Sequence, residues 1–448
     1  MRLFLVLAIL FVAPAAVGQG APLAITRTTV VDVETGARRP DHTVVVEGGR
    51  ITAVGPSAEV AVPEGATVVD GSGRFVVPGF ADMHVHLYTE GDLLTYVARG
   101  VTTVRNMAGD STHLAMRRRI AAGTVVGPRI VTAGPVVEAA PLSHPDNVEM
   151  TDPADVRAEV LRQRAAGYDF VKVYNALAPA VYDSLVAVAA ELGVPLAGHV
   201  PVDVGLDGAL AARQSTIEHF RGYVQALAVP PLAPDASFRD WSLAWNAIDT
   251  TRLSGLAART VAGGVWNVPT FTFTAHEMQP DTAHARLLAR PELHYLSLRG
   301  LPADRTVGYL APFSDADFAA VQRGLDGQFR LLRALDDAGA GLLVGTDSWL
   351  GGFAFADELD LLVRAGLSPA RVLRMATLDA ARFLGWAGTS GSVAPGKRAD
   401  LVLLDADPLV DITNTRRIRA VVLDGRMLDR PALDMLLAQA EAAAAVGE

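Results

Sequence analysis

Cysteine is absent from this 448-residue chain, which excludes disulfide bonds, thiol nucleophiles and thiolate metal ligands. Lysine is nearly absent as well. Of 39 basic residues, 37 are arginine and the two lysines are Lys172 and Lys397. Arginine stays protonated in proteins, so a position that keeps lysine in such a chain indicates a need for a neutral amine. We therefore single out Lys172, which lies inside the segment VKVYN.

A basic surface is also lacking, because the net charge is -10 and the pI is near 5.5. This balance argues against nucleic acid or an anionic membrane as a partner. Hydrophobic residues make up 50% of the chain and charged residues 20%, which fits a globular protein with a large core.

The N-terminus begins with Arg2, followed by an apolar run over residues 3–12 and then by small residues up to Gly18 and Gly20. This order is typical of a secretory signal peptide, and the run is about half of the ~20 residues that cross a bilayer. We expect residues 1–20 to be a cleaved leader and the mature protein to be periplasmic or secreted. A buried N-terminal strand or helix is the alternative.

Short β-branched runs separated by Asp, Gly and Pro occupy both ends of the remaining chain, at residues 21–77 and 389–430. Such runs are typical of small sheets. Together they predict one discontinuous β-sandwich domain built from both termini. Residues 431–448 predict a C-terminal helix.

The middle of the chain, residues 78–388, alternates strand patterns with helical patterns such as 152–167 and 178–193. This alternation predicts parallel βαβ units, and eight of them close into an α/β fold of the (β/α)8 TIM-barrel type. The stretch 276–338 is mostly helical and predicts an insertion near the site. The eight expected strands are 80–87, 101–107, 129–137, 169–175, 194–200, 215–220, 265–273 and 341–348.

Polar side chains end several of these strands, at the edge where such barrels place their active sites. His84 and His86 are two residues apart, so both side chains point to one face of the first strand. Later strands end in His199, His219 and Asp347. A lone histidine in a barrel is usually a hydrogen-bonded core residue, but this group predicts a metal centre. Imidazole and carboxylate ligands without sulfur favour zinc, with manganese, cobalt or iron as alternatives.

Several segments together resemble the amidohydrolase superfamily. VPGFADMHVHL resembles its PGxxDxHxH signature, and DFVKVYN, AGHV, IEHF and GTDS resemble its later metal motifs. ATLDAARFLG and GSVAPGKRADLVLLDADPL are similar to the closing segments of its imidazolonepropionase-like and Xaa-Pro dipeptidase-like (prolidase) branch. The resemblance covers nearly the whole mature chain. It implies a metal-dependent hydrolase that acts on carbon–nitrogen bonds.

In binuclear members of that superfamily, CO2 carboxylates the lysine of the fourth strand, and the carbamate bridges both metals. The resemblance therefore implies two divalent ions, zinc by preference, and a carbamate on Lys172. The ligands it implies are His84, His86 and Asp347 for one ion, His199 and His219 for the other, and Lys172 between them. A buried Lys172 paired to Asp347 in a mononuclear site is the alternative.

Two cations about 3.5–4 Å apart would convert a bridging water to hydroxide, which attacks a carbonyl carbon. Asp347 is the expected general base and then general acid. The expected substrate is a dipeptide or an N-acyl amino acid. The alternatives are a cyclic amide or lactone, as for imidazolonepropionase, and a non-catalytic secreted metal-binding barrel. Deamination is disfavoured, because ValProValAsp follows His199 where mononuclear deaminases carry a glutamate.

Four further residues are candidates for binding the substrate. Tyr174 and Asn175 follow Lys172 at the barrel mouth, and Arg221 follows His219 and could bind a carboxylate. His144 lies in the loop after the third strand, in VEAAPLSHPDNVEM, which matches the family poorly. Each could instead be an ordinary polar residue at a strand end or on the surface. We expect a small-molecule or dipeptide substrate, no nucleic-acid or membrane partner, and leave a homo-oligomer open.

Overall fold

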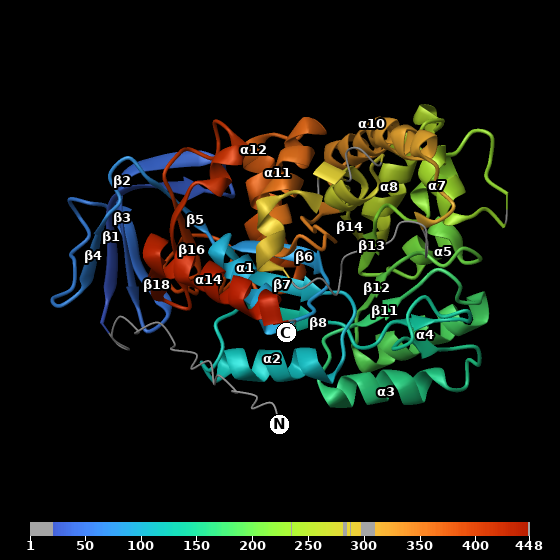
Figure 1. Ribbon diagram of the computed structural model, residues 1–448, viewed down its shortest axis with the longest axis horizontal. Coiled ribbons are helices and arrows are strands. Elements are labelled where there is room, and N and C mark those ends of the chain that lie inside the picture. Colours follow the sequence, from blue (N-terminus) through green and yellow to red (C-terminus); the bar gives the residue numbers. More distant parts are fainter. Residues whose placement is uncertain (1–20, 234, 281–284, 287, 297–309, 447–448) are drawn as a thin grey trace, which may run out of the picture.

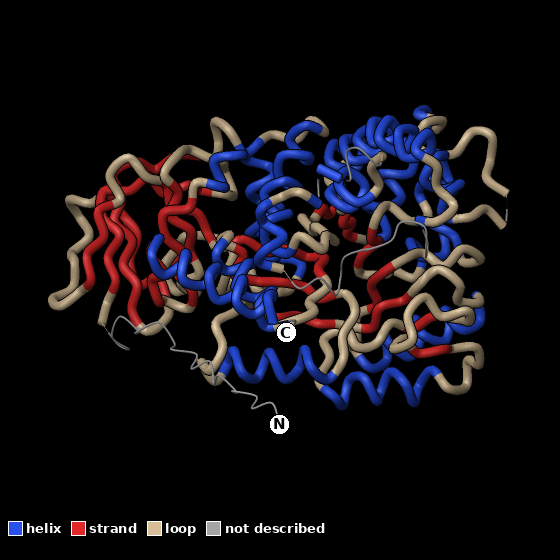
Figure 2. Tube along the Cα trace, in the orientation of Figure 1, coloured by secondary structure: helices blue, strands red, loops and turns tan. Residues whose placement is uncertain are grey.

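The computed structural model describes residues 21–446 except 234, 281–284, 287 and 297–309. Its strands gather in two groups, a sheet domain at one end of the molecule and a helix-covered barrel (Figures 1 and 2). The expected leader at residues 1–20 lies outside the described residues. In the part of the chain that the structure describes, no helix is long and apolar enough to cross a bilayer.

The sheet domain joins the two ends of the chain, as predicted. Its eight strands are hydrogen-bonded into one mixed sheet, in the order β18-β17-β16-β5-β1-β2-β3 with β4 beside β1. The two ends meet where β5 pairs antiparallel with β16. The strands are β1 (Leu23–Asp32), β2 (Ala37–Glu47), β3 (Arg50–Pro56), β4 (Thr67–Asp70), β5 (Phe75–Pro78), β16 (Leu401–Leu404), β17 (Ile418–Leu423) and β18 (Arg426–Asp429).

The barrel contains the eight expected strands in parallel, in two hydrogen-bonded sheets. The Ala133–Phe170 bridge joins the sheets on one side. On the other side Met83 N–H donates to the carbonyl of Val344 at 2.8 Å, which closes the barrel. The strands are β6 (Phe80–Val85), β7 (Val101–Asn106), β8 (Arg129–Thr132), β11 (Val171–Val173), β12 (Leu196–Gly198), β13 (Thr216–Glu218), β14 (Trp266–Val268) and β15 (Gly341–Leu342).

Several barrel strands are shorter than the sequence predicts. The run 129–137 is interrupted at Gly134-Pro135 and resumes as β9 (Val137–Glu138), which pairs with β10 (Val148–Glu149). The run 215–220 ends at Glu218 because His219 and Phe220 adopt positive φ angles of 56° and 52°. The strand ends thus turn into the loops that carry the polar residues.

Helices cover the barrel on its outside (Figure 1). The two helical patterns taken from the sequence are present as α3 and α4, which end at Gly167 and Gly193 in the left-handed conformation. The helices are α1 (Glu90–Ala98), α2 (Ser111–Ala121), α3 (Val156–Ala166), α4 (Pro179–Leu192), α5 (Gly205–Ala211), α6 (Tyr223–Leu227), α7 (Phe238–Ala244), α8 (Leu253–Gly263), α10 (Asp315–Asp337), α11 (Phe355–Arg364), α12 (Pro369–Arg374), α13 (Ala380–Phe383) and α14 (Arg430–Val446).

The expected insertion at 276–338 is described in part. It follows the π-helical turn η2 (Phe273–Glu277), includes the short turn η3 (Pro291–Tyr295) and ends in α10, the longest helix among the described residues. The remaining positions of the insertion, 281–284, 287 and 297–309, lie outside the described residues. The C-terminal helix α14 packs against α1.

Candidate metal centre

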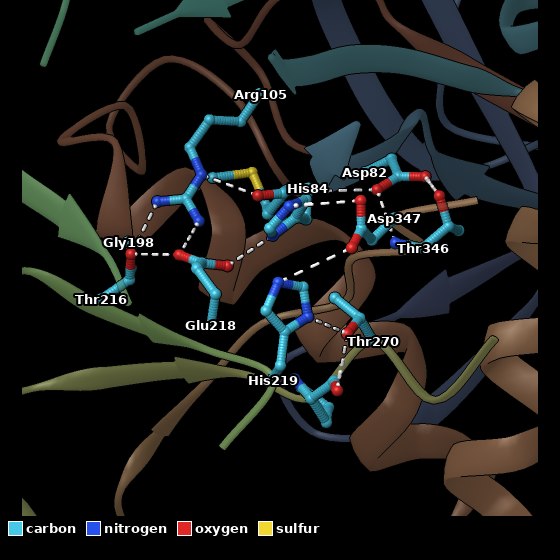
Figure 3. A network of polar contacts seen from close by, with 12 residues as sticks. Asp82, His84, Arg105, Gly198, Thr216, Glu218, His219, Thr270, Thr346 and Asp347 are labelled. Atoms are coloured by element: carbon cyan, nitrogen blue, oxygen red, sulfur yellow. Dashed lines mark hydrogen bonds and ion pairs between the residues drawn. The ribbon is translucent and has the colours of Figure 1, made fainter. Parts of the chain in front are cut away.

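The barrel mouth collects the predicted metal ligands from five strands. His84 lies in β6 and Lys172 in β11. The other ligands come just after strand ends: His86 after β6, His199 after β12, His219 after β13 and Asp347 after β15. Because parallel strands of a barrel end at the same face, these side chains converge (Figure 3). The six residues brought together are His84, His86, Lys172, His199, His219 and Asp347.

The four imidazoles form a continuous row. Ring centroids are 5.6 Å apart for His86 and His84, 4.8 Å for His84 and His219, and 5.0 Å for His219 and His199. Asp347 lies against three of these rings: its carboxylate oxygens are 3.5 Å from His84 Nε2, 3.3 Å from His86 Nε2 and 3.6 Å from His219 Nε2. The ligand atoms of His84, His86 and Asp347 all lie within 4.8 Å of one another, a group that could hold a metal ion.

Two of these residues have backbones in the left-handed region. His219 has a φ of 56° and Asp347 a φ of 44°, and Thr270 beside His219 has a φ of 51°. Non-glycine residues are uncommon there, and such conformations cluster at functional sites. Asp347 is held by its own N–H, which donates to the carbonyl of His84 at 2.8 Å. The fold thus uses strained backbone to turn these side chains into the mouth.

A hydrogen-bond acceptor orients each of three imidazoles through its Nδ1 atom. His84 Nδ1 donates to Glu218 at 2.7 Å, and His199 Nδ1 donates to the amide oxygen of Asn175 at 2.8 Å. His219 Nδ1 is 2.6 Å from the hydroxyl of Thr270, which itself donates to a backbone carbonyl. With the proton on Nδ1, each ring presents an unprotonated Nε2, the arrangement found at metal-binding histidines.

The Nε2 atoms of His84 and His199 are buried and have no hydrogen-bond partner among the described residues. Buried polar atoms are rarely left unsatisfied, so these two nitrogens fit a bound cation. Burial also lowers the pKa of His199 and His219 well below the usual value, which keeps both imidazoles neutral, the form that binds metals. The residues present therefore fit a metal centre.

Lys172 is 3% exposed in this cluster. Burial lowers the pKa of Lys172, although Asp347 and Glu218 act in the opposite direction. The carboxylate of Asp347 lies against the histidine rings, and no ion pair joins it to Lys172 in the described part of the chain. The alternative in which a buried Lys172 pairs with Asp347 is therefore not seen among the described residues. A buried amine with a lowered pKa suits a group that must react while neutral.

The candidate substrate residues divide into three that lie near the centre and one that does not. The Tyr174 ring stacks on His199 at 4.2 Å, and Asn175 is occupied as its hydrogen-bond partner. Arg221 lines a pocket beside His219. His144 has a side chain that is 63% exposed and contacts Asp146. The structure therefore does not place His144 in the centre.

The pocket beside His219, here named the Arg221 pocket, has a cavity volume of about 40 Å³ and opens to solvent. The guanidinium of Arg221 lies over the rings of Phe238 and Trp241, 4.8 and 5.2 Å from their centroids. Aromatic and apolar side chains form much of its remaining wall, among them Trp245, Phe273, Met278 and Val321. The pocket combines one cation with an apolar wall.

The model of the amidohydrolase family matches residues 75–428 of the chain. This span begins in the last N-terminal strand of the sheet domain, contains the whole barrel and returns to the sheet domain at β18. The chain belongs to the amidohydrolase family. The resemblance noted in the sequence is thereby confirmed.

This amidohydrolase is similar over nearly its whole length to proteins with several activities. Adenine deaminase 3 of Rhizobium meliloti (strain 1021) is 26% identical over 427 residues, which covers 91% of this chain and 58% of the relative. The chain thus spans less than two thirds of the adenine deaminases it matches first, 58% and 59% of their length.

Two solved structures share the fold. Bottromycin amidohydrolase is 28% identical with a TM-score of 0.73, covering 94% of this chain and 90% of that chain. A protein from Bifidobacterium longum, provisionally assigned as a prolidase, is 25% identical with a TM-score of 0.70, covering 94% and 99%. The predicted TIM-type barrel with a small sheet domain is confirmed.

The amidohydrolase centre also uses residues that the sequence analysis did not select. Glu218 accepts hydrogen bonds from His84 and Arg105, each at 2.7 Å, and Asp82 accepts from both the N–H and the hydroxyl of Thr346 (Figure 3). Burial raises the pKa of Glu218, but Arg105 and His84 outweigh it and lower the pKa to about 2. A signal was present: Arg105 and Glu218 are opposite charges inside the expected barrel strands 101–107 and 215–220, and buried charges are paired.

Proposed function

We propose that this amidohydrolase hydrolyses the amide bond of a small substrate, a dipeptide or an N-acyl amino acid. The observation that supports it most directly is Lys172, a buried lysine beside four imidazoles and Asp347. A neutral amine at this position is suited to carboxylation. The Arg221 pocket supports the substrate class, because a guanidinium above an apolar wall fits a carboxylate that carries a hydrophobic side chain.

The proposed cofactors are two divalent ions, zinc by preference, with a CO2-derived carbamate on Lys172. His84, His86 and Asp347 would hold one ion, and His199 and His219 the other, with Lys172 between them. Ions bound in this way supply a nucleophile from water at neutral pH and polarise the scissile carbonyl. The Nε2 atoms of His84 and His199, which make no hydrogen bond among the described residues, support this assignment.

The protein groups have separate tasks in the proposed reaction. Asp347, 3.3 to 3.6 Å from three imidazoles, accepts the proton of the attacking water and returns it to the leaving nitrogen. Burial raises the pKa of Asp347, but these histidines lower it well below its usual range, so it starts as the carboxylate that a base requires. Arg221 orients the substrate through its carboxylate, and Tyr174 and Asn175 hold His199 in place.

Deamination is the second candidate, favoured by the similarity to an adenine deaminase. A cyclic amide or lactone and a barrel without turnover are further alternatives. Release of ammonia from adenine with no amide hydrolysis would favour the deaminase. Hydrolysis of a cyclic amide or lactone in preference to linear substrates would favour that alternative. Metal binding without turnover of any of these compounds would favour the non-catalytic barrel.

The test couples metal analysis to a screen of dipeptides, N-acyl amino acids, lactones and adenine. The wild type is expected to contain about two metal ions per chain and to release amino acids from linear amides. Lys172→Ala is expected to lose one metal and the activity. Lys397→Ala, a change at the second lysine of the chain, is the matched control and is expected to retain both. Two metals and full activity in Lys172→Ala would contradict the carbamate assignment.

We further propose that the mature chain acts outside the cytoplasm, on the basis of the leader pattern in residues 1–20. Expression of the full chain in a Gram-negative host, followed by fractionation and N-terminal sequencing, tests this. A periplasmic product that begins near residue 21 is expected, and a full-length cytoplasmic product would contradict it.

A further inference from the structure

A second pocket lies between the barrel and the C-terminal segment that returns to the sheet domain. Its walls come from the end of α1, from η3, from the turn η6 (Gly351–Ala354) with the start of α11, and from the turn η8 (Ile412–Arg416). The cavity volume is about 70 Å³. The described residues that line it include none of the six proposed metal ligands and none that line the Arg221 pocket. This cavity, here named the Arg99 pocket, is therefore separate from the metal centre.

Three arginines line the Arg99 pocket, and two of them share an acid. Arg290 and Arg416 donate to opposite oxygens of the Asp357 carboxylate, at 3.0 and 2.5 Å. Arg290 also donates to both oxygens of Glu292, at 3.3 Å each. The side chains of Arg290 and Arg416 are 26% and 40% exposed, so solvent reaches the pocket. With Arg99 as the third cation, three positive side chains face two negative ones in this lining.

Arg99 is the cation that lacks an acid. Its side chain forms no hydrogen bond or ion pair among the described residues, and its Nε atom is buried. The guanidinium lies over the ring of Phe353, 4.4 Å from the centroid, and Tyr295 stacks on the same ring. The aromatic contact holds the guanidinium in place but supplies no oxygen acceptor for its N–H donors. Buried donors are rarely left unpaired, so this one is suited to an acceptor that arrives with a ligand.

The start of α11 adds to the positive character of the pocket. Its first three residues, 355–357, line the cavity, and no described side chain caps this end of the helix. The N-terminal end of a helix carries a partial positive charge and favours anions. The remaining wall is largely apolar, with Phe80, Phe353 and Ile418 among its residues. A guanidinium, a helix start and an apolar wall together fit an anionic group on a small organic molecule.

We propose that the Arg99 pocket is a ligand site, in which Arg99 binds the carboxylate or phosphate group of a small molecule. Guanidinium groups bind both anions through paired N–H donors, and Arg290 and Arg416 add positive charge to the same cavity. A bound anion would join α1, α11 and η8, which belong to distant parts of the chain. Because such a ligand binds the folded chain alone, it stabilises the fold. The site goes beyond the proposed function and does not depend on which reaction the metal centre catalyses.

Calorimetry on the metal-loaded protein tests the site with two probes, inorganic phosphate and butyrate. At least one is expected to bind and to raise the Tm, and the probe that binds more tightly shows whether the anion is a phosphate or a carboxylate. In Arg99→Met, which keeps the apolar contact with Phe353 but removes the charge, the affinity is expected to fall ~10–100-fold, as for loss of a charged hydrogen bond. Arg129→Met is the matched control. Arg129 lies over the Trp386 ring, 3.6 Å from the centroid, but outside the pocket, so this variant should bind as the wild type does.

Glu292→Gln is a second variant with the opposite expected sign. The change removes a negative charge from the pocket wall, so the affinity for the same probe is expected to rise ~3-fold or more, the scale of one exposed charge interaction. This result does not require Arg99→Met to fold. Probes that bind only at the metals would bind equally to the wild type and to both variants. That outcome overturns the proposal, and so does a wild type that binds neither probe.

Discussion

His84 donates its Nδ1 hydrogen to Glu218 at 2.7 Å, and its Nε2 atom faces Asp347 at 3.5 Å. Glu218 is held in turn by Arg105, also at 2.7 Å, and all three side chains of this relay are at most 1% exposed. The relay links β6, β13 and β7 across the barrel interior (Figure 3). The imidazole is therefore oriented by the protein before any ligand reaches its Nε2 atom.

Glu218→Gln tests this orientation. Glutamine can still accept the hydrogen from His84 but lacks the charge that makes the imidazole a stronger ligand, so the apparent metal affinity is expected to fall ~10–100-fold. Competition with a chelating dye measures it. Glu191→Gln, at an exposed pair with Arg157, is the control and is expected to match the wild type. Equal affinity in the two variants would show that Glu218 does not support the ligand.

Arg105→Met tests the other end of the relay. The change leaves Glu218 buried without its cation, and the free energy of unfolding is expected to fall by ~3–5 kcal/mol. Arg157→Met removes a solvent-exposed pair and is expected to leave the free energy of unfolding close to that of the wild type. Urea unfolding of the metal-free proteins compares them. Adding Glu218→Gln to Arg105→Met should recover part of the loss, and a further additive loss would argue against a coupled pair.

The sequence was sufficient for the architecture wherever one local rule decides the structure. Apolar periodicity and a closing glycine predict α3 and α4. Gly167 and Gly193 end these helices because glycine, which has no side chain, adopts the left-handed conformation without strain. The β-branched runs at both termini predict a shared domain. Its continuous mixed sheet depends on the β5–β16 pairing between segments over 300 residues apart, which no local pattern encodes.

The positions of the metal-ligand side chains were predictable, because side chains alternate along a strand and parallel strands end at one face of the barrel. The spacing of His84 and His86, and the position of Lys172, put these side chains at the mouth. The orienting partners were not predictable in the same way. Thr270 meets His219 across two neighbouring strands through a left-handed backbone. Such contacts depend on loop geometry, which tertiary packing determines.

Arg221→Met tests recognition of the carboxylate. Methionine keeps the apolar contact with Phe238 and Trp241 but removes the charge. KM for N-acyl amino acids with a free carboxylate is expected to rise ~10–100-fold, as for loss of a charged hydrogen bond, and kcat to change little. Substrates whose carboxylate is blocked as an amide should be unaffected. Arg259→Met, at an exposed pair with Asp207, is the control. An equal effect on blocked and free substrates would exclude this role.

Glu358→Gln tests the pH dependence of stability. Burial raises the pKa of Glu358 to about 8, against hydrogen bonds from Phe271 and Thr272, from the usual value of 4.5. Because the folded state binds this proton more tightly, the stability it contributes is fully present below pH 4.5 and is lost as the pH rises toward 8.

The loss is expected to approach ~1.4 kcal/mol per pH unit between these limits. Glutamine does not ionise, although its NH2 replaces one of the two accepting oxygens at a cost that does not depend on pH. Glu358→Gln should therefore gain stability relative to the wild type as the pH rises from 5 to 8. Urea unfolding at several pH values in that interval measures the difference in free energy of unfolding between the variant and the wild type. The titration of all other groups cancels in this difference. Exposed Glu64→Gln is the control and should run parallel to the wild type. A parallel course for Glu358→Gln as well would show that Glu358 ionises normally in the folded chain.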